Sequence, residues 1–216
     1  MKSSNSIWLF SFIFFVPILF LGVQGHDIIT HLVTSRNFST QFWQGDIFPK
    51  WLYEMNDGLG SPILYYYPYI GYYLIALLAP LNCIGGFFGL ENGFLPLFGA
   101  CYLALALSGL AINLFLKKLT DKSTALLLSI LYLVSAYHLA TTLYLRVGYY
   151  ELWSFVFVPL CLYYTHKNHL TKLAICYGLL VLCHPLSAGI FSPVLGCYII
   201  LQKYYQLLFA PFVGIM

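Results

Sequence analysis

Long apolar runs, separated by short polar segments, limit most strongly what this chain can fold into. Apolar residues make up 61% of its 216 residues and charged residues only 8%, whereas a soluble domain carries about 25% charged residues. So few charged side chains cannot cover a surface in water, which excludes a soluble globular domain. The net charge of +3 is small and dispersed, which excludes nucleic acid as a partner. We therefore expect an all-α, polytopic transmembrane helix bundle in the lipid bilayer.

A transmembrane helix needs about 20 apolar residues, and this length divides the chain into segments. We expect one membrane-embedded domain over residues 1–216, with a first span at residues 7–24 and a long external loop at residues 25–62. Further spans are expected at residues 94–116, 125–142, 152–164 and 173–190, whereas the tail, residues 192–216, is left undivided. The first run also fits a cleaved signal peptide, but the apolar remainder favours an uncleaved helix. An apolar end is typical of an N-terminal fragment of a longer protein.

The lysines orient the chain, because cytoplasmic loops of membrane proteins are rich in positive charge. Lys117, Lys118 and Lys122 lie in one short loop, and Lys167 and Lys172 lie in another. If both loops are cytoplasmic, residues 25–62 and 143–151 are external. Residues 63–90 then begin and end outside, so we expect this segment to be re-entrant, interfacial or a short hairpin. If it is instead one ordinary span, all later sides reverse.

Asp27 follows the first span directly, at the edge of the bilayer, where an unpaired acid is costly. On a helix, Asp27 and His31 are four residues apart and share one face. The pair could bind a divalent cation, or act as a base and its orienting partner. The alternative is that Asp27 only stabilises a helix N-terminus through the helix dipole.

Arg146 and Glu151 lie at the second external loop. A planar guanidinium could bind a phosphate or diphosphate through two parallel hydrogen bonds. The alternative is an Arg–Glu pair that neutralises two charges near the bilayer. His184, followed by Pro185, interrupts an apolar stretch. It is either a functional residue within the membrane or a helix-packing residue bonded to a neighbour.

The first loop and the tyrosine cluster add further candidates. Asp46, Lys50 and Asn56 lie among glycines and prolines, which impose defined turns. Tyr66 and Tyr67 belong to the run Tyr-Tyr-Tyr-Pro-Tyr at residues 65–69. Their rings could line the path of a lipid or sugar, or anchor the chain at the membrane interface.

The order of these pieces resembles a known family. After the first helix with its acid and histidine come Gly-Asp-Ile-Phe-Pro-Lys-Trp, Asn-Asp-Gly-Leu-Gly-Ser-Pro, the Tyr-Tyr-Tyr-Pro cluster, Arg-x-Gly-x-x-Glu and His-Pro-Leu-Ser. Over residues 7–187 the chain resembles the N-terminal part of the bacterial integral membrane family labelled pyruvoyl-tetrahydropterin-synthase-related. That family is similar to the C-type (GT-C) glycosyltransferases, which use lipid-linked sugars. A pterin synthase is a soluble zinc enzyme with a histidine triad, so the family label does not carry its activity to this chain.

The resemblance implies a GT-C-like, multi-pass glycosyltransferase of the bacterial cytoplasmic (inner) membrane. It implies a polyprenyl-phosphate sugar as donor and an active site on the extracytoplasmic face. In this family pattern Asp27 matches the catalytic base, with His31 as its partner, and Arg146 and Glu151 match the second loop, which binds donor phosphate or metal. Asp27 and Glu151 are thus candidate ligands of a divalent cation, Mg or Mn. The chain departs from the superfamily in having no Asp-x-Asp pair, so the resemblance alone does not establish a metal.

A non-catalytic membrane protein, such as a transporter or a flippase-like subunit, is the alternative from a different class. Transporters place polar residues near the middle of the bilayer, often in broken helices. Nearly all polar candidates here are expected at one interface, which favours the transferase. His184 with Pro185 is the feature that favours the transporter.

Overall fold

The chain is all-α throughout the part that the computed structural model describes, which is residues 3–21, 25–87, 89–90 and 92–215. No strand occurs in these ranges, where Leu52 and Ser61 form an isolated β-bridge. The predicted all-α class is therefore confirmed. The end of the expected first span, residues 22–24, lies outside the described residues.

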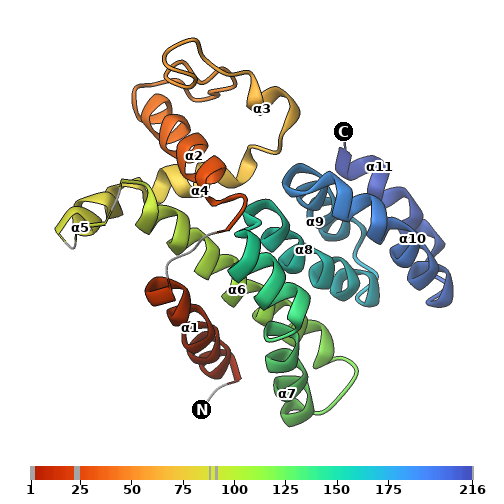
Figure 1. Cartoon of the computed structure of the whole chain (residues 1–216). Helices are drawn as coiled ribbons and strands as arrows, with labels where there is room; N and C mark the ends of the chain where they lie inside the picture. Colours follow the sequence, from red (N-terminus) through yellow and green to blue (C-terminus); the bar gives the residue numbers. More distant parts are fainter. Residues whose placement is uncertain (1–2, 22–24, 88, 91, 216) are drawn as a thin grey trace.

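Most helices follow one another with short connections, whereas a long loop joins α2 to α3 (Figure 1). The first half contains α1 (Ser3–Leu21), α2 (Ile28–Trp43), α3 (Ile63–Tyr66), α4 (Ile70–Leu78), η1 (Ala79–Leu81), α5 (Asn82–Phe87) and α6 (Phe94–Leu116). The second half contains α7 (Lys122–Leu133), η2 (Ala136–Arg146), α8 (Tyr149–His166), α9 (Leu170–Cys183), α10 (Pro185–Leu201), η3 (Tyr205–Phe209) and α11 (Ala210–Ile215).

Helix α6 is the centre of the larger core. It contacts α1, α4, α7 and α8, and its buried face carries small residues such as Ala104 and Gly109. A Cβ added at Gly109 would lie 2.8 Å from a methyl carbon of Ile7 and 3.1 Å from Leu133, so this glycine lets three helices approach closely. A second core joins α8, α9, α10 and the C-terminal helices.

One end of the bundle carries the predicted lysine loops. The Lys117 ammonium donates a hydrogen bond to Ser3 Oγ over 2.6 Å, which joins the start of α1 to the end of α6. The neighbouring Lys167 ammonium lowers the pKa of Lys118, so the loops that follow α6 and α8 lie together. We call this the lysine end.

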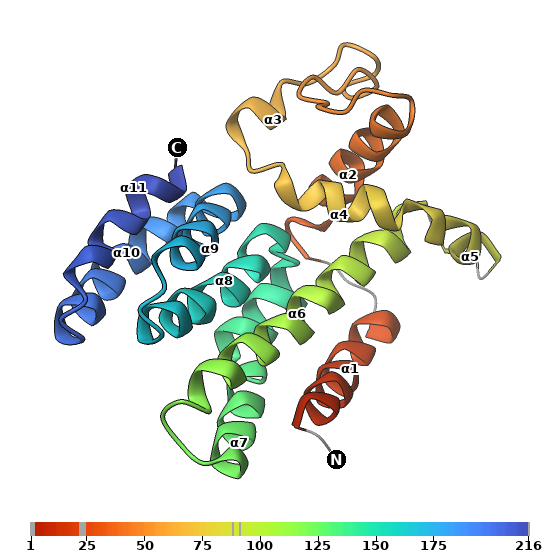
Figure 2. The ribbon, with the colours of Figure 1, turned by 180° about the vertical axis from the view of Figure 1, so that it is seen from behind.

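At the opposite end of the bundle, the start of α2 contacts the end of η2 and the start of α6. The Asp27 N–H donates to the Arg146 carbonyl over 3.1 Å, and Gly93, just before α6, lies against Leu32. The chain therefore lies at this end where α2 begins, and it is at this end again where α6 begins. In the two opposite views, α4, η1 and α5 stay near the level at which α6 begins (Figures 1 and 2). The placement of this segment in a bilayer stays a prediction.

Among the described residues, three helical stretches are long and apolar enough to cross a membrane. They are Ile70–Phe87, Phe94–Leu116 and Lys122–Arg146. The second coincides with the helix expected at residues 94–116. The third contains the segment expected at residues 125–142, but it changes at Ala136 from an α-helix into the π-helix η2.

Two expected segments differ from the structure. The helix expected at residues 173–190 is divided at His184, which has φ −153° and ψ 88° between α9 and α10. The cause is Pro185, because a proline disfavours helical dihedrals in the residue before it. The expected loop at residues 25–62 contains the 16-residue helix α2. Within the expected tail, the rest of α10 is followed by η3 and α11.

Candidate functional site

A cavity of about 530 Å³ opens at the end of the bundle opposite the lysines. Its wall comes from the start of α2, from α3, from the end of η2, from the start of α8 and from the junction of α9 and α10. We call it the charged cavity. It brings together these predicted site residues: Asp27, His31, Tyr66, Tyr67, Arg146, Glu151 and His184.

Arg146 links the two acids of the charged cavity. Its Nη1 lies 3.1 Å from Glu151 Oε2, and its Nη2 lies 3.4 Å from Asp27 Oδ2. The Glu151 side chain is 9% exposed, whereas those of Asp27 and Arg146 are 42% and 39% exposed. The pair with Glu151 is thus the buried, shorter contact, and the pair with Asp27 is longer and open to the cavity.

Glu151 is held firmly on both carboxylate oxygens. The Tyr137 hydroxyl donates to Oε1 over 2.5 Å, and Arg146 occupies Oε2. Glu151 also lies in the first turn of α8, where the helix dipole favours a negative charge. These contacts indicate that Glu151 fixes the position of the Arg146 guanidinium.

The backbone around Arg146 is constrained. Val147 has φ +55° at the end of the π-helix η2, a conformation that is costly for a β-branched residue. Gly25 packs on the Arg146 carbonyl so closely that an added Cβ would lie 2.7 Å from its oxygen. The first loop and the end of η2 therefore meet through backbone atoms as well as through side chains.

His31 is buried behind Asp27 and is 4% exposed. Its Nδ1 lies 3.1 Å from the Tyr72 hydroxyl, and its ring packs edge-on against Tyr150 at 4.8 Å between centroids. Burial lowers the pKa of His31 to about 4, with Asp27 opposing the shift and Arg146 adding to it, so the imidazole is neutral at pH 7. The two predicted partners share the cavity, but Nδ1 is engaged by Tyr72 rather than by the Asp27 carboxylate.

His184 lies at the break between α9 and α10 and faces the same cavity. Its Nδ1 accepts a hydrogen bond from the Ser187 N–H over 3.3 Å and lies 2.6 Å from the Ser187 hydroxyl. His184 therefore caps the N-terminus of α10. Tyr66 and Tyr67 also line the charged cavity and are exposed.

Three predicted candidates lie outside the charged cavity and support the first loop. Asp46 accepts hydrogen bonds from the Gln41 amide and the Phe48 N–H. The Lys50 ammonium lies 4.7 Å from the centre of the Phe48 ring. The Asn56 amide donates to the Gly60 carbonyl over 2.9 Å. These contacts give all three a structural role in the loop.

Arg146 engages both acids that the resemblance offers as ligands of a divalent cation. The two acids offered as ligands, Asp27 and Glu151, are already bridged by the Arg146 guanidinium, which repels a metal ion. Within the described ranges, His, Cys, Asp and Glu side chains form no group of three suited to a metal. Mg²⁺ sites can consist of one or two carboxylates together with waters and substrate phosphates, so the cation expected at Asp27 and Glu151 stays a prediction.

Sequence reasoning missed the contacts that Tyr137, Tyr72 and Tyr150 make with the predicted site residues. Tyr137 precedes Glu151 by 14 residues, and only the path of η2 brings its hydroxyl to the carboxylate. Tyr72 contacts His31 from α4, 41 residues away. With 19 tyrosines in the chain, no spacing distinguishes these three from the rest.

Comparisons with protein families, with curated proteins and with solved structures found no match to this chain.

Proposed function

We propose that this protein is a membrane glycosyltransferase that moves a sugar from a polyprenyl-phosphate donor to an acceptor hydroxyl at the extracytoplasmic face. The observation that carries the proposal is the open Asp27–Arg146 pair, backed by the buried Arg146–Glu151 pair, at the end of the bundle opposite the lysines. The GT-C resemblance of the sequence supports the same reaction class. We place the protein in the bacterial cytoplasmic (inner) membrane as a multi-pass protein.

The donor phosphate binds Nη2 of Arg146, the nitrogen that faces Asp27. Glu151, which Tyr137 holds in place, keeps its contact with Nη1 of Arg146. A phosphate therefore displaces only the longer 3.4 Å contact between Nη2 and Asp27. A guanidinium suits this task because it presents two parallel donors to phosphate oxygens. Ile63, Pro68 and Leu186 give the cavity an apolar side, which accommodates the first part of the lipid.

Asp27, released from Arg146, then acts as the base. Its carboxylate takes the proton of the acceptor hydroxyl, whose oxygen bonds to the anomeric carbon. The bond from that carbon to the phosphate oxygen breaks, and its electron pair leaves on the polyprenyl phosphate. Arg146 stabilises the charge of this leaving group. His31, neutral at pH 7, packs behind Asp27 and keeps its position.

The transporter alternative keeps one supporting observation. Helices α9 and α10 are broken at His184, and this break lines the charged cavity, as broken helices line transporter sites. A transporter would move the lipid-linked sugar between leaflets without cleaving it, whereas a transferase releases polyprenyl phosphate.

The distinguishing experiment uses the full chain in nanodiscs and in vesicles, with undecaprenyl-phosphate glucose, mannose, galactose and N-acetylglucosamine labelled in the sugar. Methyl glycosides are the acceptors. The proposal expects undecaprenyl phosphate and a labelled disaccharide glycoside from at least one donor. Movement of intact donor across the vesicle bilayer without cleavage would refute the transferase and favour the transporter. Neither cleavage nor movement of any donor would refute both.

A further inference from the structure

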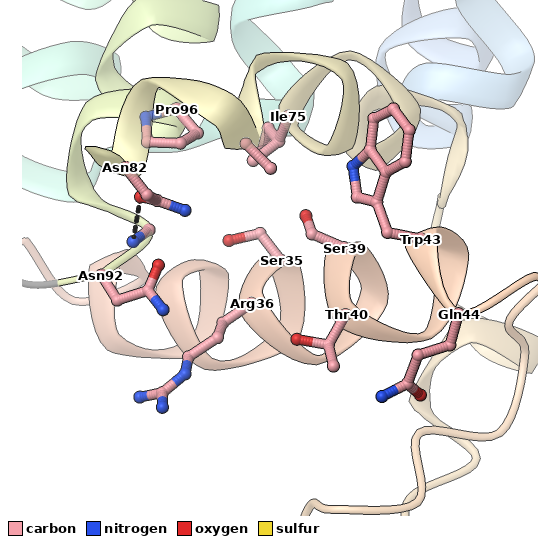
Figure 3. A pocket seen from close by; sticks show the side chains of 12 residues that line it. Ser35, Arg36, Ser39, Thr40, Trp43, Gln44, Ile75, Asn82, Asn92 and Pro96 are labelled. Carbon is pink, nitrogen blue, oxygen red and sulfur yellow. Dashed lines mark hydrogen bonds between the residues drawn. The ribbon is translucent and has the colours of Figure 1, made fainter. Parts of the chain in front are cut away.

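A second cavity, of about 270 Å³, lies further along α2, toward its C-terminal end. Its floor is the polar face of α2 that carries Ser35, Ser39 and Trp43, and its far wall includes Ile75 and Asn82 (Figure 3). These α2 positions continue the row of every fourth residue that begins with Asp27 and His31, one to three turns further along the helix. The residues that line it do not overlap with those of the charged cavity. We call it the neutral cavity.

The neutral cavity presents hydrogen-bonding groups without charge. Ser39 is only 8% exposed, and its hydroxyl, which points into the cavity in Figure 3, makes no hydrogen bond within the described part of the chain. Asn82 uses its Oδ1 to accept from the Gly93 N–H over 2.8 Å, so its Nδ2 hydrogens remain to donate. These groups face the cavity, and a ligand with both donors and acceptors would bond to them.

Trp43 adds an aromatic wall. Its indole N–H donates to the Ala76 carbonyl over 2.8 Å, which fixes the ring, yet the residue is 60% exposed. A fixed, exposed ring offers its face to a ligand at little entropic cost. The C–H face of a pyranose ring packs on such a surface, while the hydroxyls at the edge of the same ring reach the serines and the amide.

Size and charge narrow the ligand further. Pockets for drug-sized ligands measure about 300–1,000 Å³, so 270 Å³ suits a single sugar ring. None of the described residues that line the cavity is acidic, and the one cation among them, Arg36, turns its guanidinium away from Ile75 (Figure 3). We propose that the neutral cavity is a separate binding site for a neutral sugar ring. This proposal does not depend on the function proposed for the charged cavity.

The test measures saturation-transfer NMR from the full chain in nanodiscs to the methyl glycosides of glucose, galactose, mannose and N-acetylglucosamine. The protein must be prepared without glucoside or maltoside detergents, whose head groups belong to the proposed ligand class. We expect transfer to at least one glycoside. Ser39→Ala should weaken its binding about fivefold, the effect of one neutral hydrogen bond, without unfolding the protein, because the hydroxyl has no partner there.

Further variants locate the site. Asn82→Asp keeps the acceptor for Gly93 and removes the amide donor, so it should weaken binding as well. Trp43→Leu should weaken it more than Trp43→Phe, which keeps an aromatic face. Ser123→Ala, an exposed serine at the lysine end, is the matched control, and Asp27→Asn tests the charged cavity. Binding of no glycoside, or binding lost in Asp27→Asn but unchanged in Ser39→Ala and Trp43→Leu, would overturn the proposal.

Discussion

The N–H of Asp27 donates a hydrogen bond of 3.1 Å to the carbonyl of Arg146, a residue 119 positions later in the chain. The same two residues also meet through their side chains at 3.4 Å. The backbone contact fixes where α2 begins relative to the end of η2. The side-chain contact can therefore open toward a ligand while the two segments stay joined.

Gly25→Ala should separate these segments. An added Cβ would lie 2.7 Å from the Arg146 carbonyl oxygen and 2.9 Å from its carbon, and backbone atoms on both sides cannot move aside cheaply. We expect a lower apparent melting temperature in detergent, equivalent to about 1–3 kcal/mol. Gly189→Ala is the matched control, because a Cβ there meets nothing within 4 Å. Equal melting temperatures for the two variants would contradict the tight contact.

Stability should fall in acid because of His31. Its pKa is about 4 in the folded protein and 6.5 when exposed, so between these values the unfolded chain takes up a proton that the folded chain does not. The contribution of neutral His31 to the free energy of unfolding is therefore complete above pH 6.5 and decreases as the pH falls toward 4. It amounts to about 3 kcal/mol at most. Melting curves from pH 7.5 to 4 should show a smaller acid loss in His31→Gln, whereas the exposed His26→Gln should behave as wild type. Identical pH profiles for wild type and His31→Gln would contradict this role.

The two Arg146 pairs should differ in energy. Arg146→Gln leaves the buried Glu151 carboxylate with only the Tyr137 hydroxyl, which should cost about 1–3 kcal/mol. The double variant Arg146→Gln/Glu151→Gln should recover much of this loss, because it removes the unpaired charge. Asp27→Asn should change the melting temperature little, since exposed ion pairs contribute about 0–1 kcal/mol. A double variant less stable than Arg146→Gln would show that Glu151 is not held as described.

The two ends of the bundle should face opposite sides of the membrane. In a cysteine-free background, His26→Cys and Tyr66→Cys should react with an impermeant maleimide in intact cells, because both positions are exposed beside the charged cavity. Thr120→Cys, in the loop at the lysine end, should react only after the cells are permeabilised. Reaction of Thr120→Cys in intact cells would reverse the orientation.

A helix formed by a long, uncharged apolar run could be predicted from the sequence. The run from Phe94 to Leu116 carries no charge and is bounded by Gly93 and Lys117, and the helix has these bounds. Helix α2 was harder to recognise, because its buried face includes His31, Thr34 and Gln41 as well as Phe38. Its helical period is made largely of polar residues, so an apolar pattern does not reveal it.

The candidate site was predictable where charge is rare. With few acids and bases in the chain, Asp27, Arg146 and Glu151 stand out, and the structure brings them into one cavity. The partners of these residues could not be found in this way. Tyr137 reaches Glu151 only because η2 is a π-helix that ends at Val147 in a left-handed conformation, and no single-residue preference of the sequence encodes that path.

The rate of sugar transfer in Asp27→Asn, set against Asp46→Asn, tests the central claim most directly. Asp27 faces the charged cavity, whereas Asp46 lies outside it and supports the first loop. Both variants exchange one acid for its amide, and the measurement is cleavage of the undecaprenyl-phosphate sugar on which the wild type acts. We predict a fall of about 100-fold or more in kcat for Asp27→Asn, as expected for a lost general base, and little change in kcat for Asp46→Asn. A wild-type rate in Asp27→Asn would contradict the account.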